Sequence, residues 1–304
     1  MDYLISTNCL TKQYGKHKAV DSVSLHIRQG SIYGLIGRNG AGKTTVLKMI
    51  CGLSKPTSGE ITLFDKTGRD IFPLLSRIGS LIEQPGLYMD MSAKDNLKLK
   101  CIAVGADRKG YIDELLELVG LSDVGNKRVK SFSLGMKQRL GIALALVGEP
   151  DLIVLDEPIN GLDPQGIVEI REIILKLALE KNITVIISSH ILEELSKIAT
   201  HYGIIHCGRL LEEVSREELV QKCSERVELQ TEDVSGASTV IEAMGIVDYK
   251  VVDSRTIQIF ERIDEISDVT MRLSENKIKI EGIGVKNENL EDYYLNMTGG
   301  KENV

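Results

Sequence analysis

The chain has 304 residues, of which 42% are hydrophobic and 27% charged, and its net charge at pH 7 is −7. The length predicts two domains, or one large domain with an appendage, and the acidic balance gives no support for a nucleic-acid-binding surface. The five cysteines form no Cys-x-x-Cys pair, so neither a disulfide framework nor a zinc site is expected. With no signal-peptide pattern and no apolar stretch long enough to span a bilayer, a cytoplasmic protein is expected.

The first two thirds of the chain alternate between strand and helix patterns. Apolar and polar residues alternate at 23–27 with the period of a half-buried strand, so residues 2–36 are predicted to be rich in β-structure. Continuous apolar runs at 152–155 and 183–187 are typical of central strands in a parallel sheet covered on both faces. The other predicted elements are a helix at 44–51, a strand at 59–64, a helical region from about 92 to 148 and a helix at about 165–181. An α/β fold is therefore expected.

The pattern changes after about residue 215. The predicted elements are strands at 226–231, 247–252, 256–260 and 277–285, and helices at 234–244 and 264–274. Their order, β-α-β-β-α-β, is that of the ferredoxin-like arrangement. We therefore expect one domain over residues 2–215 and a small α+β domain over residues 216–304.

A glycine-rich loop lies between the apolar run 32–36 and the first predicted helix. Its residues are Gly37, Arg38, Asn39, Gly40, Ala41, Gly42, Lys43 and Thr44, and Thr45 follows. Glycines let consecutive backbone N–H groups surround a phosphate, and the helix N-terminus adds partial positive charge. Lys43 can reach the β- and γ-phosphates of a nucleotide, and the Thr44 hydroxyl can ligate Mg²⁺. Such a loop would arise by chance on the order of one time in a hundred, so the chain is predicted to bind a nucleoside triphosphate.

Two carboxylates follow the apolar run 152–155. A buried strand would deliver Asp156 and Glu157 to the phosphate site at its C-terminal end. Asp156 would hold Mg²⁺ through water, and Glu157 would orient and polarise the attacking water. Many strands end in an acid, so the phosphate loop earlier in the chain is what favours this interpretation.

The stretch 133–140 indicates a particular class of nucleotide-binding protein. It resembles the signature of the ATP-binding cassette (ABC) family, which usually reads Leu-Ser-Gly-Gly-Gln and is followed by a helix. Ser133 and Gly135 match this signature, whereas Phe132 replaces its leucine and two other positions differ. The alternative is that Ser133 is only the N-cap of an ordinary helix.

Other family elements follow from the resemblance, which spans residues 2–215. The stretch 160–163 resembles the D-loop, His190 resembles the switch histidine that contacts the γ-phosphate, and Tyr14 resembles the aromatic residue that stacks on adenine. A structural histidine at a strand end and an aromatic residue packed on the core are the alternatives. The resemblance implies a P-loop ABC ATPase cassette with a mixed, largely parallel sheet, an antiparallel β subdomain and a helical subdomain at about 88–148.

One position departs from the usual pattern of the family. Family members usually carry a glutamine that meets Mg²⁺ and water and senses the transmembrane partner. The alignment puts Glu83 at this position, and a shift of one residue would put Gln84 there instead. Glutamate at this position, together with the stretches 132–140 and 290–300, is similar to the bacitracin-resistance and lantibiotic-immunity branch of drug exporters.

The resemblance implies ATP and Mg²⁺ as cofactors and a homodimer in which the signature of one copy closes the ATP site of the other. It also implies separate transmembrane permease subunits, with this chain peripheral on the cytoplasmic face of the membrane. The alternative is a soluble ABC ATPase that acts on nucleic acid or ribosomes. Such proteins usually have two cassettes or a long coiled-coil insertion, neither of which this sequence has, so no nucleic-acid partner is expected.

Overall fold

The computed structural model describes residues 3–223, 225–286 and 290–298. The chain divides into two compact units, Met1–Arg216 and Glu217–Val304. The last two residues of the stretch 290–300, which resembles drug exporters, lie outside the described residues.

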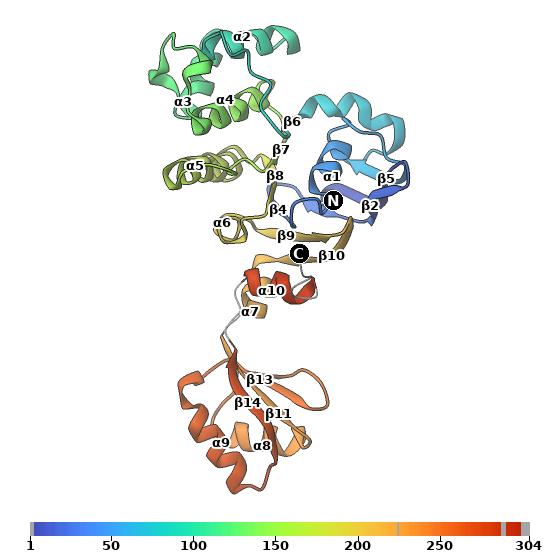
Figure 1. Cartoon of the computed structure of the whole chain (residues 1–304), viewed down its shortest axis with the longest axis vertical. Helices are drawn as coiled ribbons and strands as arrows, with labels where there is room; N and C mark the ends of the chain where they lie inside the picture. Colours follow the sequence, from blue (N-terminus) through green and yellow to red (C-terminus); the bar gives the residue numbers. More distant parts are fainter. Residues whose placement is uncertain (1–2, 224, 287–289, 299–304) are drawn as a thin grey trace. The chain divides into compact units, whose positions relative to one another are not determined.

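A six-stranded sheet forms the centre of the first unit, with the strand order β10-β9-β4-β8-β7-β6 (Figure 1). The strands are β4 (Ile32–Ile36), β6 (Ile78–Leu81), β7 (Leu152–Asp156), β8 (Thr184–Ser189), β9 (His201–His206) and β10 (Arg209–Ser215). All neighbours pair in parallel except β9 and β10, which form an antiparallel pair. Every residue of β4, β7 and β8 is buried, as their continuous apolar runs predict. The carboxyl ends of these three strands therefore meet at one edge of the sheet.

A smaller antiparallel sheet lies beside this centre. It consists of β1 (Tyr3–Tyr14), β2 (His17–Val23), β3 (His26–Arg28) and β5 (Ser58–Leu63). Helix α1 (Lys43–Ile50) buries Val46, Leu47, Met49 and Ile50 in a hydrophobic core that it shares with both sheets. This packing fixes the N-terminus of α1, and with it the glycine-rich loop that precedes the helix.

Helices occupy most of residues 93–146, beside the edge strand β6 (Figure 1). They are α2 (Ala93–Val104), α3 (Tyr111–Leu118), α4 (Leu134–Leu146) and the short 3₁₀ turns η2 (Ser122–Val124) and η3 (Val129–Ser131). Ser92 is the N-cap of α2 and forms a capping box with Asp95. Each of the two side chains accepts a hydrogen bond from the backbone N–H group of the other residue, so two N–H groups at the start of the helix are satisfied. The long α5 (Pro164–Lys181) follows β7, the 3₁₀ helix η1 (Gly68–Arg77) precedes β6, and α6 (Leu192–Ser196) follows β8.

The second unit contains a four-stranded antiparallel sheet with the order β12-β13-β11-β14. Its elements are β11 (Arg226–Thr231), α8 (Val234–Ala243), β12 (Tyr249–Val251), β13 (Thr256–Ile259), η4 (Ile263–Glu265), α9 (Ile266–Glu275) and β14 (Ile280–Lys286). Buried residues of β11, β13, α8 and α9 form a core separate from that of the first unit. Two further helices are α7 (Arg216–Cys223) and α10 (Leu290–Met297). No described helix combines the length and the apolar composition needed to cross a membrane.

Candidate functional site

The glycine-rich loop connects β4 to α1 and is packed from one side only. A Cβ atom on Gly37 would lie 2.5 Å from the backbone oxygen of Ile205, and one on Gly42 would lie 2.6 Å from that of Ala19. A Cβ atom on Gly40 would meet no atom within 4 Å. Gly40 and Gly42 have φ values of 83° and 106°, which glycine adopts without strain. The loop is thus backed by β9 and β2 and has open space at Gly40, which fits a phosphate cradle.

Lys43, the first residue of α1, points back beneath this loop. Its side chain is 5% exposed, and Nζ donates a hydrogen bond of 2.6 Å to the carbonyl oxygen of Gly37. Nζ also lies 3.0 Å from Oε1 of Glu157. A buried ammonium group is costly unless it is paired, so these two contacts explain how the cation is held here.

Thr44 and Asp156 form the part of the site that suits a metal ion. The Thr44 hydroxyl donates to Oδ2 of Asp156 at 2.8 Å, and Asp156 is 4% exposed. No group of three or more His, Cys, Asp or Glu side chains that could hold a metal is found among the described residues. Mg²⁺ needs no such cage, because one or two carboxylates together with substrate phosphates and waters complete its coordination. The hydroxyl and carboxylate oxygens of Thr44 and Asp156 therefore fit this ion.

Glu157 lies between two groups that can interact with a negative charge. Its Oε1 is 3.0 Å from Nζ of Lys43, and its Oε2 is 2.7 Å from Nδ1 of His190. The contact with Lys43 has the distance of an ion pair but not the geometry of a hydrogen bond, so Oε1 is buried with no hydrogen-bond partner. The sequence prediction named all three of these residues, and the structure brings them together.

Ser188, which the sequence prediction gave no role, lies between the two acids. Its hydroxyl donates to Oδ1 of Asp156 at 2.6 Å and accepts from the backbone N–H of Glu157 at 3.0 Å. The contact follows from the sheet register, in which Asp156 on β7 pairs with Ser188 on β8. The sequence contains a signal for this contact, because two serines, Ser188 and Ser189, directly follow the apolar run 183–187.

Glu83 and Gln84 point to different parts of the first unit. Glu83 forms an ion pair of 2.6 Å with Nζ of Lys48, which lies one helical turn after Thr44 on α1. The hydrogen bond to Glu83 raises the pKa of Lys48 above its usual value. Gln84 instead lines a cleft of about 760 Å³ that α2, α4 and β6 also line. Of the two alternatives that the sequence left open, Glu83 is thus the one whose side chain is directed toward α1.

Tyr14 and the signature stretch lie on elements of their own. Tyr14 ends β1 with its ring 51% exposed, and Nζ of Lys12 lies 5.0 Å from the ring centre. Ser133 is the N-cap of α4, where its hydroxyl accepts from the backbone N–H of Met136 at 3.2 Å. A Cβ atom on Gly135 would lie 3.8 Å from Leu162. Ser133 and Gly135 thus lie at the N-terminus of α4, where Gly135 is close to the stretch 160–163 of the same chain. The phosphate loop lies on a different element, at the start of α1.

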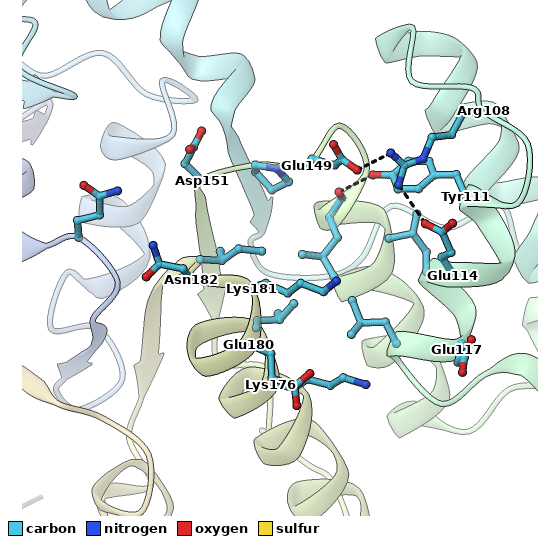
Figure 2. Close-up of a pocket in the computed structure, with 17 residues that line it drawn as sticks. Arg108, Tyr111, Glu114, Glu117, Glu149, Asp151, Lys176, Glu180, Lys181 and Asn182 are labelled. Atoms are coloured by element: carbon cyan, nitrogen blue, oxygen red, sulfur yellow. Dashed lines mark hydrogen bonds and ion pairs between the residues drawn. The ribbon is translucent and has the colours of Figure 1, made fainter.

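A second cavity, of about 630 Å³, is lined by α3, α5 and the segment between α4 and β7 (Figure 2). Arg108 forms ion pairs there with Glu114 at 3.0 Å and Glu149 at 2.8 Å. The Tyr111 hydroxyl donates to the carbonyl oxygen of Leu146 at 3.1 Å. No residue of the predicted nucleotide site lines this cavity, so it is separate from that site.

Comparisons with known proteins identify the fold and the family of the chain. Residues 20–160 match the family model described as "ABC transporter". A solved ATP-binding cassette, described as a dimer in a post-hydrolysis state bound to ADP and Pi, is 26% identical with a TM-score of 0.63. The match covers 70% of this chain and 98% of that one. The predicted fold class is therefore confirmed.

Two curated relatives are more similar in sequence. The bacitracin transport ATP-binding protein BcrA of Bacillus licheniformis is 44% identical over 305 residues, which are 99% of each chain. The lantibiotic transport ATP-binding protein SrtF of Streptococcus pyogenes is 46% identical over 204 residues, which are 66% of this chain and 86% of that protein. The chain therefore belongs to the family of ABC transporter ATP-binding proteins.

Proposed function

We propose that the chain is the ATP-hydrolysing subunit of an ABC exporter, works as a homodimer and drives separate permease subunits. The observation that carries the proposal is the position of Glu157, whose carboxylate lies between Lys43 and His190 next to the pair formed by Thr44 and Asp156. This arrangement brings a base, two hydrogen-bond donors and a metal-binding pair to one edge of the sheet, which is what phosphoryl transfer to water requires.

Each residue of the site has a role in the proposed reaction. Glu157 accepts a hydrogen bond from the attacking water and orients it, because a carboxylate is a good acceptor and this one directly follows Asp156 beside Thr44. Lys43 and the backbone N–H groups of the loop hold the transferred phosphate, and His190 donates to its oxygens. A bound Mg²⁺, held by Thr44, Asp156 and Glu83, would neutralise charge on the phosphates.

The nucleotide base and the second wall of the site involve residues outside this cluster. The half-exposed ring of Tyr14 offers a flat apolar face on which adenine can stack. Ser133 begins a helix of 13 residues, whose N-terminus offers N–H groups and partial positive charge to an anion. We infer that Ser133 and Gly135 of one copy contact the γ-phosphate that the loop of the other copy holds. The dimeric form of the solved relative supports this inference.

The permease subunits would dock at the cleft that Gln84 lines. Large apolar side chains on this cleft are exposed to solvent: Leu53 at 64%, Tyr88 at 62%, Leu99 at 39% and Val104 at 47%. Covering such side chains with an apolar segment of a partner would be favourable. Gln84 on this cleft is the direct neighbour of Glu83 in the chain. A docked segment could therefore respond to changes at Thr44 and Asp156, where the metal would be bound. The chain would then be peripheral on the cytoplasmic face of the membrane.

The exported compound is proposed from the relatives alone. BcrA is a bacitracin transport protein and SrtF a lantibiotic transport protein. Because both compounds are antimicrobial peptides, we propose an antimicrobial peptide as the compound exported here. Co-purification of a polytopic membrane protein with the chain would support the permease partner, whereas co-purification of ribosomes or nucleic acid would contradict it.

The hydrolytic proposal is tested with Glu157→Gln, which keeps the size of the side chain and removes its basicity. We expect ATP turnover by the purified protein to fall at least about a hundredfold, since general-base catalysis typically contributes that much or more. The matched control is Glu149→Gln, because Glu149 has a φ of 55° like the 50° of Glu157 but is paired with Arg108 on the second cavity. Near-normal turnover by Glu157→Gln, or an equal loss in both variants, would contradict the mechanism.

A further inference from the structure

Two adjacent serines end strand β8, and their hydroxyl groups have different surroundings. Ser188 and Ser189 are both 0% exposed. The Ser189 hydroxyl accepts from the backbone N–H of Ile191 at 2.9 Å, a local contact within the segment that follows the strand. The Ser188 hydroxyl instead bonds across the sheet to the carboxylate of Asp156 and the backbone of Glu157.

We propose that Ser188 is a positioning residue, which sets the orientation of the metal-binding Asp156 and the catalytic Glu157 with a single hydroxyl group. The proposal rests on the hydrolytic function assigned above to these two acids. Ser188 itself would donate to neither the nucleotide nor a metal-bound water, because its only hydroxyl proton already goes to Asp156 and the residue is 0% exposed.

The bond to Asp156 determines which carboxylate oxygen faces the metal. Ser188 holds Oδ1 at 2.6 Å, and Thr44 donates to Oδ2 at 2.8 Å. With Oδ1 held from behind, Oδ2 is directed to the side of Thr44, where Mg²⁺ would be bound. Removal of the Ser188 hydroxyl would leave Oδ1 without this donor in a residue that is 4% exposed. The carboxylate would then turn toward other donors, and the metal-binding oxygen would move with it.

The bond to Glu157 supports an unusual backbone conformation. Glu157 has a φ of 50°, a left-handed value that is uncommon for a residue with a side chain and costs about 1–2 kcal/mol. Its N–H group donates to both the backbone oxygen of Ser188, at 3.2 Å, and the Ser188 hydroxyl, at 3.0 Å. This backbone conformation places the Glu157 carboxylate between Lys43 and His190. Ser188 therefore acts on the position of the base through the peptide group and not through the carboxylate.

A purely structural role for Ser188 makes a different prediction. The strand is buried along its whole length, so any polar group on it needs partners, and a serine could be retained only to satisfy its neighbours. In that case its loss would lower stability and activity together, and Ser189 would behave in the same way. A positioning role predicts that activity and the Mg²⁺ requirement change beyond what stability explains.

The test compares Ser188→Ala with Ser189→Ala in the full-length protein. We measure thermal stability, ATP turnover as a function of Mg²⁺, and binding of a fluorescent ATP analogue with Mg²⁺ and with EDTA. For Ser188→Ala we expect turnover to fall about 10- to 100-fold and the Mg²⁺ concentration for half-maximal effect to rise by a similar factor. Analogue binding in EDTA should stay within about threefold of wild type, because the phosphate loop is untouched. Ser189→Ala should retain wild-type turnover and Mg²⁺ dependence.

A second variant, Ser188→Thr, keeps the hydroxyl but adds a methyl group in a buried position. We expect it to be less stable than Ser188→Ala because of overpacking, yet more active because the hydrogen bonds remain. Activity that follows thermal stability across all three variants would overturn the proposal, as would equal losses in Ser188→Ala and Ser189→Ala. If wild-type protein hydrolyses no ATP, the proposed function fails. An unchanged Mg²⁺ dependence of analogue binding in Ser188→Ala contradicts the role of Ser188 alone.

Discussion

Replacement of Glu83 by alanine removes the acid that we propose for the position of the family's usual glutamine. In the structure Glu83 contacts Lys48 at 2.6 Å, with side-chain exposures of 63% and 32% for Glu83 and Lys48. An exposed ion pair of this kind contributes about 0.2–1 kcal/mol to stability. For a unit of this size that corresponds to a fall of at most about 4 °C in the thermal midpoint. The fold should therefore tolerate the change.

The expected effect on Mg²⁺ is larger. Loss of a group that orients a metal or its waters typically costs about 10- to 100-fold in affinity, or about 1.4–2.8 kcal/mol. We expect Glu83→Ala to raise the Mg²⁺ concentration that gives half-maximal ATP turnover by this factor. Glu83→Gln should show a smaller rise, because an amide oxygen remains a suitable Mg²⁺ partner and is the usual one in this family.

The assay is a Mg²⁺ titration of ATP turnover at saturating ATP, and Gln84→Ala is the matched control. Gln84 lines the cleft beside α2 and α4, so its loss should leave the Mg²⁺ dependence unchanged. The opposite pattern, with an unchanged titration for Glu83→Ala and a shifted one for Gln84→Ala, would show that Glu83 does not orient the metal. It would also assign the family's glutamine position to Gln84.

Substitutions at three further positions test separate parts of the structure. Tyr33→Phe removes a hydrogen bond of 2.7 Å to the Glu213 carboxylate, which contributes about 1.5–3 kcal/mol to stability. Differential scanning calorimetry should therefore show a thermal midpoint about 3–12 °C lower, whereas ATP turnover at 25 °C should be unchanged. Gly37→Ala would place a Cβ atom 2.5 Å from the Ile205 carbonyl oxygen, so the loop must move at a cost of about 1–3 kcal/mol. Equilibrium titration should then show that the fluorescent ATP analogue binds at least about fivefold more weakly. Tyr14→Ala should weaken ATP binding about 5- to 150-fold through loss of base stacking, whereas Tyr14→Phe should bind like wild type; equal affinities for all three proteins would exclude stacking.

Much of the first unit could be predicted from local sequence patterns. The apolar runs at 152–155 and 183–187 became the central strands β7 and β8, because a strand buried on both faces is apolar at most of its positions. Strand β9 was not predicted. It contains Gly203, where a Cβ atom would lie 2.2 Å from the Tyr33 hydroxyl oxygen, so this glycine reflects a tertiary contact that strand propensity does not record.

The candidate site could be predicted to a similar extent. Lys43, Asp156 and Glu157 belong to motifs whose spacing along the chain indicates their chemistry, and the structure brings them together. Ser188 belongs to no such motif. Its contact with Asp156 depends on the register between β7 and β8, which is set by packing over the whole sheet.

In the mechanism proposed above, ATP joins two copies of the chain, and each copy completes the site of the other. The most direct measurement is the molar mass of Glu157→Gln by light scattering, since this variant should bind ATP without hydrolysing it. We predict that the mass doubles with ATP, stays at that of one chain with ADP, and returns to one chain when Gly135→Asp is added. A mass of one chain at saturating ATP, together with ATP hydrolysis by the wild-type protein, would contradict the claim.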